Sequence, residues 1–351
     1  MDLALYHDLE SYHAWAMGKL FGLCRPLTDD ALDASLPLGM GTLRATLQHI
    51  AAAEQIWLDR WVGKSTTGLP MMPTALLELE SNFALLARDR KALFEGDSQV
   101  FRASVKYKSL DGKSHENNLG SLAIHVLNHA VHHRAQALTF LKKQGVTIPG
   151  GLDYIFYRIA VPTVLLKSPA AAGCRQWGLE VGEVAKPYSS PDLDSLIRYG
   201  EYGDWAMQSV FDQVVDFSDE QLDTEHGMGL GSIRKTLLHL LDAESFWQAN
   251  WKTPGSPFPS TPKTTSINEL ASLWSSMTSS KRAWLEQAGQ PKLGDIVRVD
   301  FGSGPLEFRL SESVIQLAVH GTLHRAQATN MIRTAGKKPK SLDYVTWLRT
   351  L

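Results

Sequence analysis

The sequence predicts an all-α protein made of two tandem four-helix bundles, each with a small β-hairpin before its last long helix. Three observations lead to this prediction. Residues 12–61 align without a gap with residues 202–251, at a constant offset of 190. Each half contains four long stretches in which apolar residues recur at helical spacing. A short alternation of apolar and polar residues, typical of strands, precedes the fourth stretch.

Length and composition agree with a duplicated globular protein. The chain has 351 residues, with 44% hydrophobic and 21% charged residues. Such a length predicts about two domains, and each is large enough to bury a core of its own. We expect a first bundle over 1–160, a linker rich in Pro, Ala, Gly and Ser over 161–191, and a second bundle over 192–351.

The first three helices of a copy are predicted from their ends. The first covers about residues 3–24, and Pro26 follows it. The second runs to about residue 62 from Thr42, which stands where an N-cap residue belongs. The third covers about 74–94, and its counterpart begins at Ser266 with Ser-Ile-Asn-Glu, a capping-box pattern.

A hairpin, a fourth helix and a short closing segment complete each copy. The first hairpin is predicted from an Asp111-Gly112 turn and from the alternating residues Phe101, Ala103, Val105 and Tyr107. The second copy has a Gly-Ser-Gly turn over 302–304. The fourth helix is expected over about 120–144 and 311–335, and a Leu-Asp-Tyr segment follows each time. The long second connection and the hairpin in the third indicate a non-sequential bundle topology.

Composition also excludes several classes of function. The net charge is −2 and no basic stripe runs along a helix, so we expect no nucleic-acid partner. No apolar run has membrane-spanning length, and the N-terminus lacks the basic region of a signal peptide. Cys24 and Cys174 are not equivalent in the repeat, which argues against a disulfide framework. We therefore predict a soluble, cytoplasmic protein that acts on a small molecule and has no membrane partner.

The repeated chemical feature is a group of three histidines. His129 and His133 lie four residues apart in the fourth helix, so both project from one face. His49, in the middle of the second helix, is the candidate third ligand. The two equivalent sets are His49, His129 and His133, and His239, His320 and His324. Three imidazoles suit zinc, nickel, copper or ferrous iron and leave a position open for water or substrate.

The alternative is that these histidines are hydrogen-bonded residues of the core. His125 and His132 offer competing pairings with His129, but their counterparts are Gln316 and Leu323. Only the three-histidine sets occur in both halves. This recurrence favours metal ligation.

Other repeated polar residues surround this motif. Gln136 and its counterpart Gln327 return to the ligand face, where each could bind a cofactor or substrate group, hold a ligand imidazole, or form an interhelical hydrogen bond. For Arg134 and Arg325 we expect salt bridges to the second helix, at Glu54 and Glu244. No catalytic side chain can be named, since Cys24 has Val214 as its counterpart.

These motifs resemble the DinB/YfiT-like superfamily of metal-binding four-helix bundles, here in tandem. The resemblance rests on LQHIAAAEQIW and LLHLLDAESFW around His49 and His239, and on NHAVHHRAQ and VHGTLHRAQ, each followed by LDY. It implies two crossover connections and a divalent metal, zinc or nickel with iron as a further option, held by the three histidines. Characterised relatives include transferases and isomerases that use bacillithiol, mycothiol or glutathione, and related domains occur in iron-dependent sulfoxide synthases. The metal-site assembly common in the superfamily is a dimer of single domains, so the tandem is expected to form an intramolecular pseudo-dimer and to be monomeric.

The leading functional hypothesis is a metal-dependent transferase that activates a low-molecular-weight thiol. A metal-hydroxide hydrolase would use the same open position. A non-catalytic, metal-stabilised binding module is the third hypothesis. A ferritin-like dimetal site is excluded, because the pair Glu10 and His13 has Gly200 and Gly203 as its counterpart.

Overall fold

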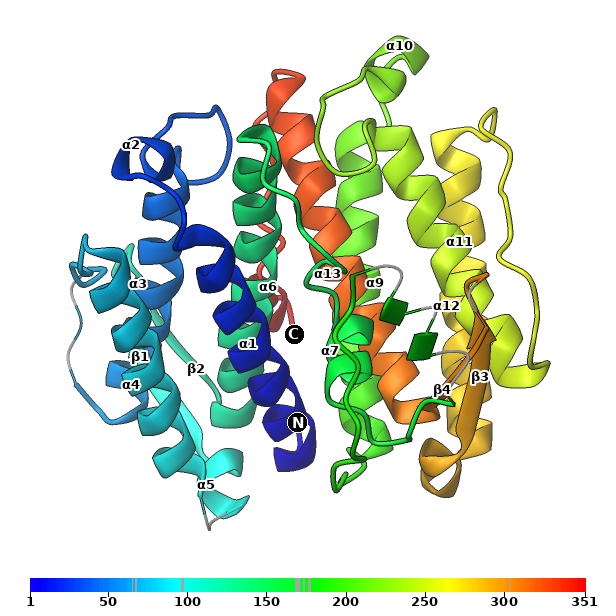
Figure 1. The fold of residues 1–351 in the computed structure, drawn as a ribbon, viewed down its shortest axis with the longest axis horizontal. Helices are drawn as coiled ribbons and strands as arrows, with labels where there is room; N and C mark the ends of the chain where they lie inside the picture. The colour runs from blue at the N-terminus through cyan, green and yellow to red at the C-terminus, as the bar shows by residue number, and fades with distance from the viewer. Residues whose placement is uncertain are drawn as a thin grey trace. The chain divides into compact units, whose positions relative to one another are not determined.

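A computed structural model describes residues 1–64, 66, 68–95, 98–167, 171–172, 174–175, 178–302 and 304–351. Within these residues the protein is mainly helical, with two small antiparallel hairpins, which confirms the predicted fold class (Figure 1). Residues 168–170, 173 and 176–177 of the predicted linker lie outside the described residues, as does Ser303 of the predicted Gly-Ser-Gly turn. No described helix is both long and apolar enough to cross a membrane.

The chain divides into two compact units, residues 1–147 with 341–351, and residues 148–340. The first unit contains four long helices, three short ones and a hairpin: α1 (Leu3–Cys24), α2 (Asp29–Leu32), α3 (Leu43–Trp61), α4 (Leu76–Phe94), α5 (Ser98–Arg102), β1 (Ser104–Lys108), β2 (Ser114–Asn118), α6 (Leu119–Lys143) and α14 (Tyr344–Leu348).

The second unit has the same organisation. Its elements are α7 (Tyr154–Ala160), α9 (Leu193–Val214), α10 (Asp219–Asp223), α11 (Ile233–Lys252), α12 (Ile267–Ala288), the 3-10 helix η1 (Gln290–Gly294), β3 (Ile296–Asp300), β4 (Pro305–Arg309) and α13 (Leu310–Thr334).

Helix order within each bundle brings the histidine-bearing helices together. In the first unit α6 packs against α1 and α3, and α4 packs against the same two helices. The consecutive long helices α1 and α3 therefore lie on a diagonal, in agreement with the predicted non-sequential topology. The second unit repeats this order, with α13 and α12 each packed against α9 and α11. The helix with one histidine thus lies beside the helix with two.

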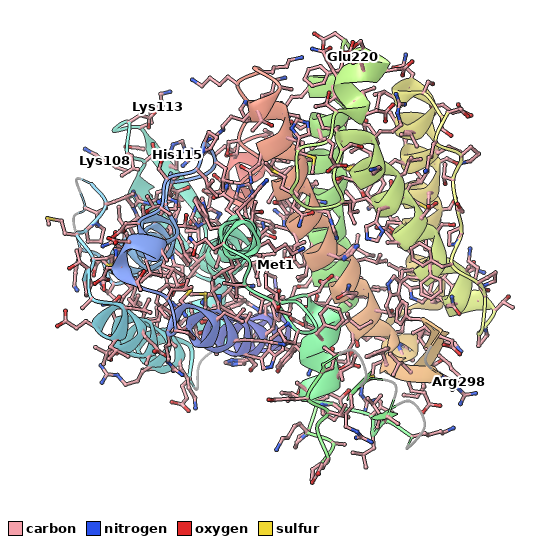
Figure 2. The ribbon with its side chains drawn as sticks, turned by 45° about the horizontal axis from the view of Figure 1, so that its top comes forward. Met1, Lys108, Lys113, His115, Glu220 and Arg298 are labelled. Carbon is pink, nitrogen blue, oxygen red and sulfur yellow. The ribbon has the colours of Figure 1, made fainter. Side chains whose placement is uncertain are left out.

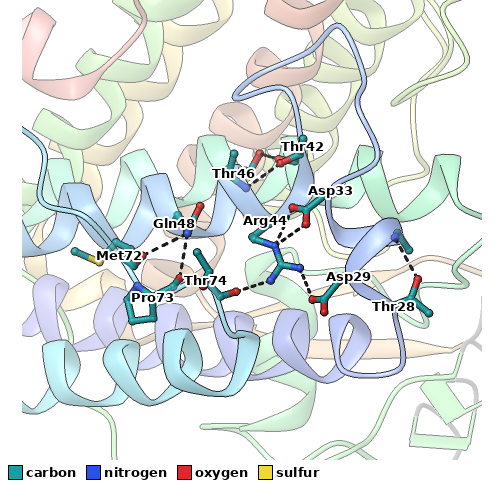
Figure 3. A network of polar contacts seen from close by, with 12 residues as sticks. Thr28, Asp29, Asp33, Thr42, Arg44, Thr46, Gln48, Met72, Pro73 and Thr74 are labelled. Atoms are coloured by element: carbon teal, nitrogen blue, oxygen red, sulfur yellow. Dashed lines mark hydrogen bonds and ion pairs between the residues drawn. The ribbon is translucent and has the colours of Figure 1, made fainter.

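A polar network at the start of α3 fixes the helix that carries His49 (Figure 3). Arg44 donates hydrogen bonds to Asp33 (2.8 Å), to Asp29 (2.5 Å) and to the carbonyl oxygen of Thr74. It thereby joins α2, α3 and the segment before α4. The second unit has the same network at Arg234, with Asp219, Asp223 and Thr265.

The short Leu-Asp-Tyr segments are exchanged between the repeats. Helix α7 follows the first repeat in sequence but packs on α13, in the second unit, whereas α14 packs on α6 in the first. The backbone N–H of Ile155 donates to Gln316 Oε1 at 2.8 Å, and that of Val345 donates to His125 Nδ1 at 3.3 Å. Each packing unit therefore includes a segment from the other sequence repeat, so the units differ from the repeats 1–160 and 192–351.

The first hairpin differs from its prediction at one end. Residues 98–102 form the helix α5, and the strand begins only at Ser104. The reason is that Phe101 is buried against the rings of Tyr6 and Phe94, with centroids 5.5 and 5.3 Å away. The side chain of Phe101 fits the alternating pattern of a strand in the sequence, but it packs on the helical bundle and is not part of the sheet.

Candidate metal centre

The first candidate centre lies between α3 and α6. His49 comes from α3, and His129 and His133 come from successive turns of α6. The Nε2 atom of His129 is 3.3 Å from that of His49 and 3.1 Å from that of His133. The structure therefore brings together the three histidines predicted for this half.

The second candidate centre has the same composition, with His239 from α11 and His320 and His324 from α13. Here the Nε2 atoms of His239 and His320 are 3.0 Å apart. In each centre the three ligand atoms lie within 4.8 Å of one another. Among the described residues, no fourth histidine, cysteine or carboxylate belongs to either group.

This arrangement fits a divalent metal ion. Nitrogens bound at 2.0–2.1 Å to a tetrahedral zinc lie about 3.3 to 3.4 Å from each other, close to the separations observed here. Converging lone pairs would repel one another without a shared cation or proton. His49, His129 and His133 could hold one ion, and His239, His320 and His324 a second.

Burial keeps four of the imidazoles, those of His49, His129, His133 and His239, in the neutral form that binds metal. It lowers the pKa of His129 well below the ordinary value, and the neighbouring His133 and His49 lower it further. Burial also lowers the pKa of His49, and it lowers that of His239 to about 4, where His320 adds to the effect. Neutral imidazoles offer a lone pair at neutral pH, so metal binding there requires little proton displacement.

Glutamines fix the tautomer of one ligand in each centre. Nδ1 of His133 donates to Gln136 Oε1 at 2.8 Å, and His324 makes the same contact with Gln327. Because Nδ1 carries the proton, the Nε2 lone pair points to the shared site. These contacts place both glutamines against a ligand imidazole, while their binding of a cofactor stays a prediction.

A glycine lies against each of these amides. Gly39 has a φ of +50°, and an added Cβ would stand 2.4 Å from Gln136 Oε1. Gly229, with a φ of +53°, has the same relation to Gln327, at 2.6 Å. The backbone here must be left-handed and must lack a side chain for the glutamine to keep its place.

Asp153 gives the second centre a contact that has no equivalent among the described residues of the first. Its Oδ2 lies 2.5 Å from Nδ1 of His320, within the second unit. A carboxylate on the distal nitrogen of a ligand imidazole orients the ring and makes it more basic. The counterpart Asp343 instead accepts a hydrogen bond from Ser341 Oγ at 3.0 Å. The sequence alone predicts for both aspartates only a role in fastening the closing segments to the bundle.

More histidines surround the first centre. The ring of His125 is 5.8 Å from that of His129, and the ring of His132 is 5.0 Å from that of His133. Burial lowers the pKa of His125 to about 4, and its Nδ1 is used by the Val345 N–H. These two histidines support neighbouring groups and do not join the ligand set.

An apolar cavity of about 350 Å³ adjoins the second centre. His239 and His320 form part of its wall, together with Asp153 and Gln316. The rest is mainly apolar: Ile155, Phe156, Ile159, Trp247, Phe301 and Leu306. All of these residues lie in the second unit, α7 included. A small molecule at the open metal position would meet an apolar wall.

The predicted salt bridges of Arg134 and Arg325 are wrong. Nη1 of Arg134 contacts Nδ1 of His13 at 2.7 Å, and Nε2 of His13 contacts Glu54 at 3.0 Å. Arg325 donates to Thr322 Oγ1 at 3.1 Å. In the first unit His13 lies between Arg134 and Glu54. In the second unit another cation holds the glutamate, since Lys281 lies 2.6 Å from Glu244.

Fold and sites thus describe a helical-bundle protein that is duplicated within one chain and carries a possible metal centre in each bundle. The DinB family model matches residues 1–161 and 193–350, and the chain belongs to the DinB family. Searches of curated proteins and of solved structures gave no match.

Proposed function

We propose that this protein is a divalent-metal-dependent transferase that activates a low-molecular-weight thiol. The observation that carries the proposal is the set of three converging imidazoles, without a fourth protein ligand among the described residues. A structural zinc site usually has four protein ligands, whereas a site with three leaves one position for a reactant.

The bound ion would favour the thiolate over the thiol near neutral pH. The side chains of the protein hold the ligands in place for this task. Gln327 and Asp153 each bind the Nδ1 atom of a ligand, so the Nε2 atoms of His324 and His320 stay directed to one point. The lowered pKa of His239 keeps a proton from competing with the metal for its nitrogen.

The cavity beside the second centre indicates the kind of substrate. Its walls are aromatic and aliphatic, and its few polar groups cluster at the histidines. Such a site suits a reactant with an apolar body and a single polar head directed to the metal. Apolar walls also exclude water, which disfavours hydrolysis of the electrophile.

The proposed reaction joins a thiol to an electrophilic carbon. The S–H bond breaks and its proton passes to solvent. The sulfur lone pair forms an S–C bond, and the leaving group departs with the electron pair of the bond it loses. The thiol and the electrophile are the two co-substrates, and no oxidant is needed.

We further propose that the two bundles act as an intramolecular pseudo-dimer. The exchange of α7 and α14 supports this, since each packing unit uses a segment of the other repeat. Residues 161–191 act as the linker in this proposal. A monomeric state and a cytoplasmic location stay predictions.

The test is thiol consumption with an aromatic electrophile such as 1-chloro-2,4-dinitrobenzene, using zinc-, nickel- or iron-loaded protein and several thiols. We expect metal-dependent turnover that is lost in the His49→Ala/His239→Ala variant and kept in His226→Ala, a control histidine outside both centres. Cobalt-loaded protein should show a thiolate charge-transfer band on addition of the active thiol.

Other outcomes would decide between the alternatives. Metal-dependent hydrolysis of p-nitrophenyl acetate without thiol would favour the hydrolase. Equal rates for the wild type and the double variant, with no thiolate band, would contradict catalysis and leave a metal-stabilised binding module.

A further inference from the structure

A cationic groove of about 610 Å³ lies between the C-terminal end of α3 and the β1–β2 hairpin, within the first unit. Arg60, Lys106, Lys108 and His115 contribute to its lining, around the ring of Tyr107. Figure 2 shows Lys108, Lys113 and His115 gathered at this hairpin. Two buried rings link the groove to the three-histidine centre: Trp57 packs on Tyr107 of the groove, and His125 packs between Trp57 and His129. None of the three histidines lines the groove itself.

Arg60 is the unusual residue of the groove. It is 8% exposed, and its guanidinium lies over the rings of Trp57 (4.7 Å) and Tyr107 (5.6 Å). Its Nε donates to Thr66 Oγ1 at 3.3 Å. Among the described residues it has no carboxylate partner and no acceptor for its Nη atoms. Four other buried arginines do contact carboxylates, namely Arg44, Arg90, Arg158 and Arg234. The buried Arg134 and Arg325 instead contact His13 and Thr322.

The charges around Arg60 leave a positive excess. Lys106 lies 3.8 Å from Glu116, and Lys64 lies 2.8 Å from Asp59, so the acids near the groove already have partners. Burial lowers the pKa of Arg60, Tyr107 acts in the opposite direction, and the nearby Arg349 lowers it again. Lys108 is exposed and forms no ion pair within the described residues. A buried cation without a counter-charge is costly, and an external anion would remove that cost.

The second unit shows that the fold does not require this cation. The counterpart of Arg60 is Asn250, whose amide donates to the carbonyl oxygens of Phe246 and Ser256. Ile159 stands at the position of Arg349, and Leu306 at that of His115. Both of these apolar side chains line the cavity of the second unit. The positively charged Arg60 and Arg349 of the first unit are thus replaced in the second by a neutral amide and by an apolar wall residue.

We propose that the groove of the first unit binds an oxyanion, a carboxylate or a phosphate group of a small molecule, with Arg60 as its principal contact. The two Nη groups of Arg60, which have no acceptor among the described residues, can bind two oxygens of such a group in a fork. Lys108 and Arg349 add longer-range attraction. The proposal does not depend on thiol transfer or on a metal ion.

The experiment titrates the full-length protein with inorganic phosphate and, separately, with acetate, at constant ionic strength, by isothermal calorimetry and by amide chemical shifts. We expect saturable binding of at least one anion, with shifts at Tyr107 and around Arg60. The anion that binds more tightly shows whether the groove prefers a phosphate or a carboxylate group. Raising the salt concentration should weaken binding, because Lys108 acts through solvent.

Substitutions locate the site. Arg60→Gln should weaken binding about tenfold or more, since it removes charge-assisted hydrogen bonds. Arg60→Lys should recover only part of the affinity because the fork is lost. Lys113→Gln removes one charge from the same hairpin at a residue paired with Asp111, and it should leave binding unchanged.

Absence of saturable binding for both anions would overturn the proposal. So would unchanged affinity in an Arg60→Gln protein whose melting curve shows it to be folded. If that variant does not fold, Lys108→Gln and Arg349→Gln decide: a loss of affinity in either supports the groove, and unchanged affinity in both contradicts it.

Discussion

The two bundles hold the same three candidate ligand histidines in different surroundings. The second centre has a carboxylate, Asp153, on the distal nitrogen of His320 and an apolar cavity beside it. The first has His125 and His132 nearby, and its hairpin borders a cationic groove. The geometry of the three histidines therefore depends on α3, α6 and their counterparts, whereas the hairpins and exchanged segments determine the chemistry around each centre.

The buried ionic groups differ in the same way. In the first unit Arg90 contacts two carboxylates, Glu54 at 2.5 Å and Glu10 at 2.9 Å. In the second unit Lys281 contacts Glu244, and the small residues Gly200 and Gly203 replace Glu10 and His13. A cavity of about 40 Å³ lies there, lined by Gly203, Asp204 and Arg325 among others. Side chains thus fill the ionic cluster of the first unit, whereas a small cavity remains at the equivalent place in the second.

The largest expected loss of stability comes from removing the arginine of the ionic cluster in the first unit. Arg90→Met leaves two carboxylates without their cation in a site where Arg90 is 1% exposed. Loss of one partner from such a buried group costs about 3 to 5 kcal/mol. Lys281→Met removes a single ion pair and should cost less. Urea unfolding with amide hydrogen exchange reports on each unit, and a loss below about 1 kcal/mol for Arg90→Met would contradict the account.

The next largest expected effect is a loss of metal affinity at the second candidate centre but not at the first. Asp153→Asn keeps the shape of the side chain but removes the charge on the distal side of His320, so metal affinity at the second centre should fall by roughly 10- to 100-fold. Asp343→Asn is the matched control, and the first centre should keep its affinity. Competition titration with a chromophoric chelator measures both. Equal losses in the two variants would remove the proposed difference between the centres.

The pH dependence of stability should have opposite signs in the two units. Burial raises the pKa of Asp204 from 3.8 to about 6, against the effect of Lys281. Its protonated form is favoured in the folded state, so its contribution is complete below pH 3.8 and is lost as the pH rises through 6. Asp204→Asn should therefore increase the free energy of unfolding at pH 7 by on the order of 3 kcal/mol, and not at pH 3.5. An equal change at both values would contradict this.

Glu54 is the opposite case in the first unit. Burial would raise its pKa, but the charges of Arg90 and His13 and their hydrogen bonds lower it from 4.5 to about 2. Its contribution to stability is present above pH 4.5 and is lost as the pH falls through 2. Protonation of Glu54 should thus lower the free energy of unfolding of the wild type as the pH falls from 4.5 to 2. In Glu54→Gln the free energy of unfolding should depend less on pH over this range.

The sequence predicted the long helices and the ligand sets because both depend on local spacing. Helix α3 begins after Thr42 as expected, and Ser266 caps α12. His129 and His133 share a helix face by geometry, and the repeat identified His49 as their partner. These features require no knowledge of tertiary contacts.

Features that depend on long-range packing were missed. The exchange of α7 and α14 joins segments far apart in the sequence, so the contact of Asp153 with His320 has no local signal. The spacing of Glu10 and His13 suggests only a dimetal motif, yet both residues belong to the buried cluster of Arg90 and Glu54. A clue existed in the repeat: both residues are replaced by glycine in the second copy, together with a change of Arg90 to Lys281.

Metal stoichiometry tests the central claim most directly. Untagged protein loaded with zinc or cobalt and freed of excess ion should contain two ions per chain. The His129→Ala and His320→Ala variants should each contain one, and the double variant none, with all three still folded as judged by circular dichroism. Two ions per chain in the double variant, or none in the wild type under saturating metal, would contradict the assignment of these histidines as two independent metal centres.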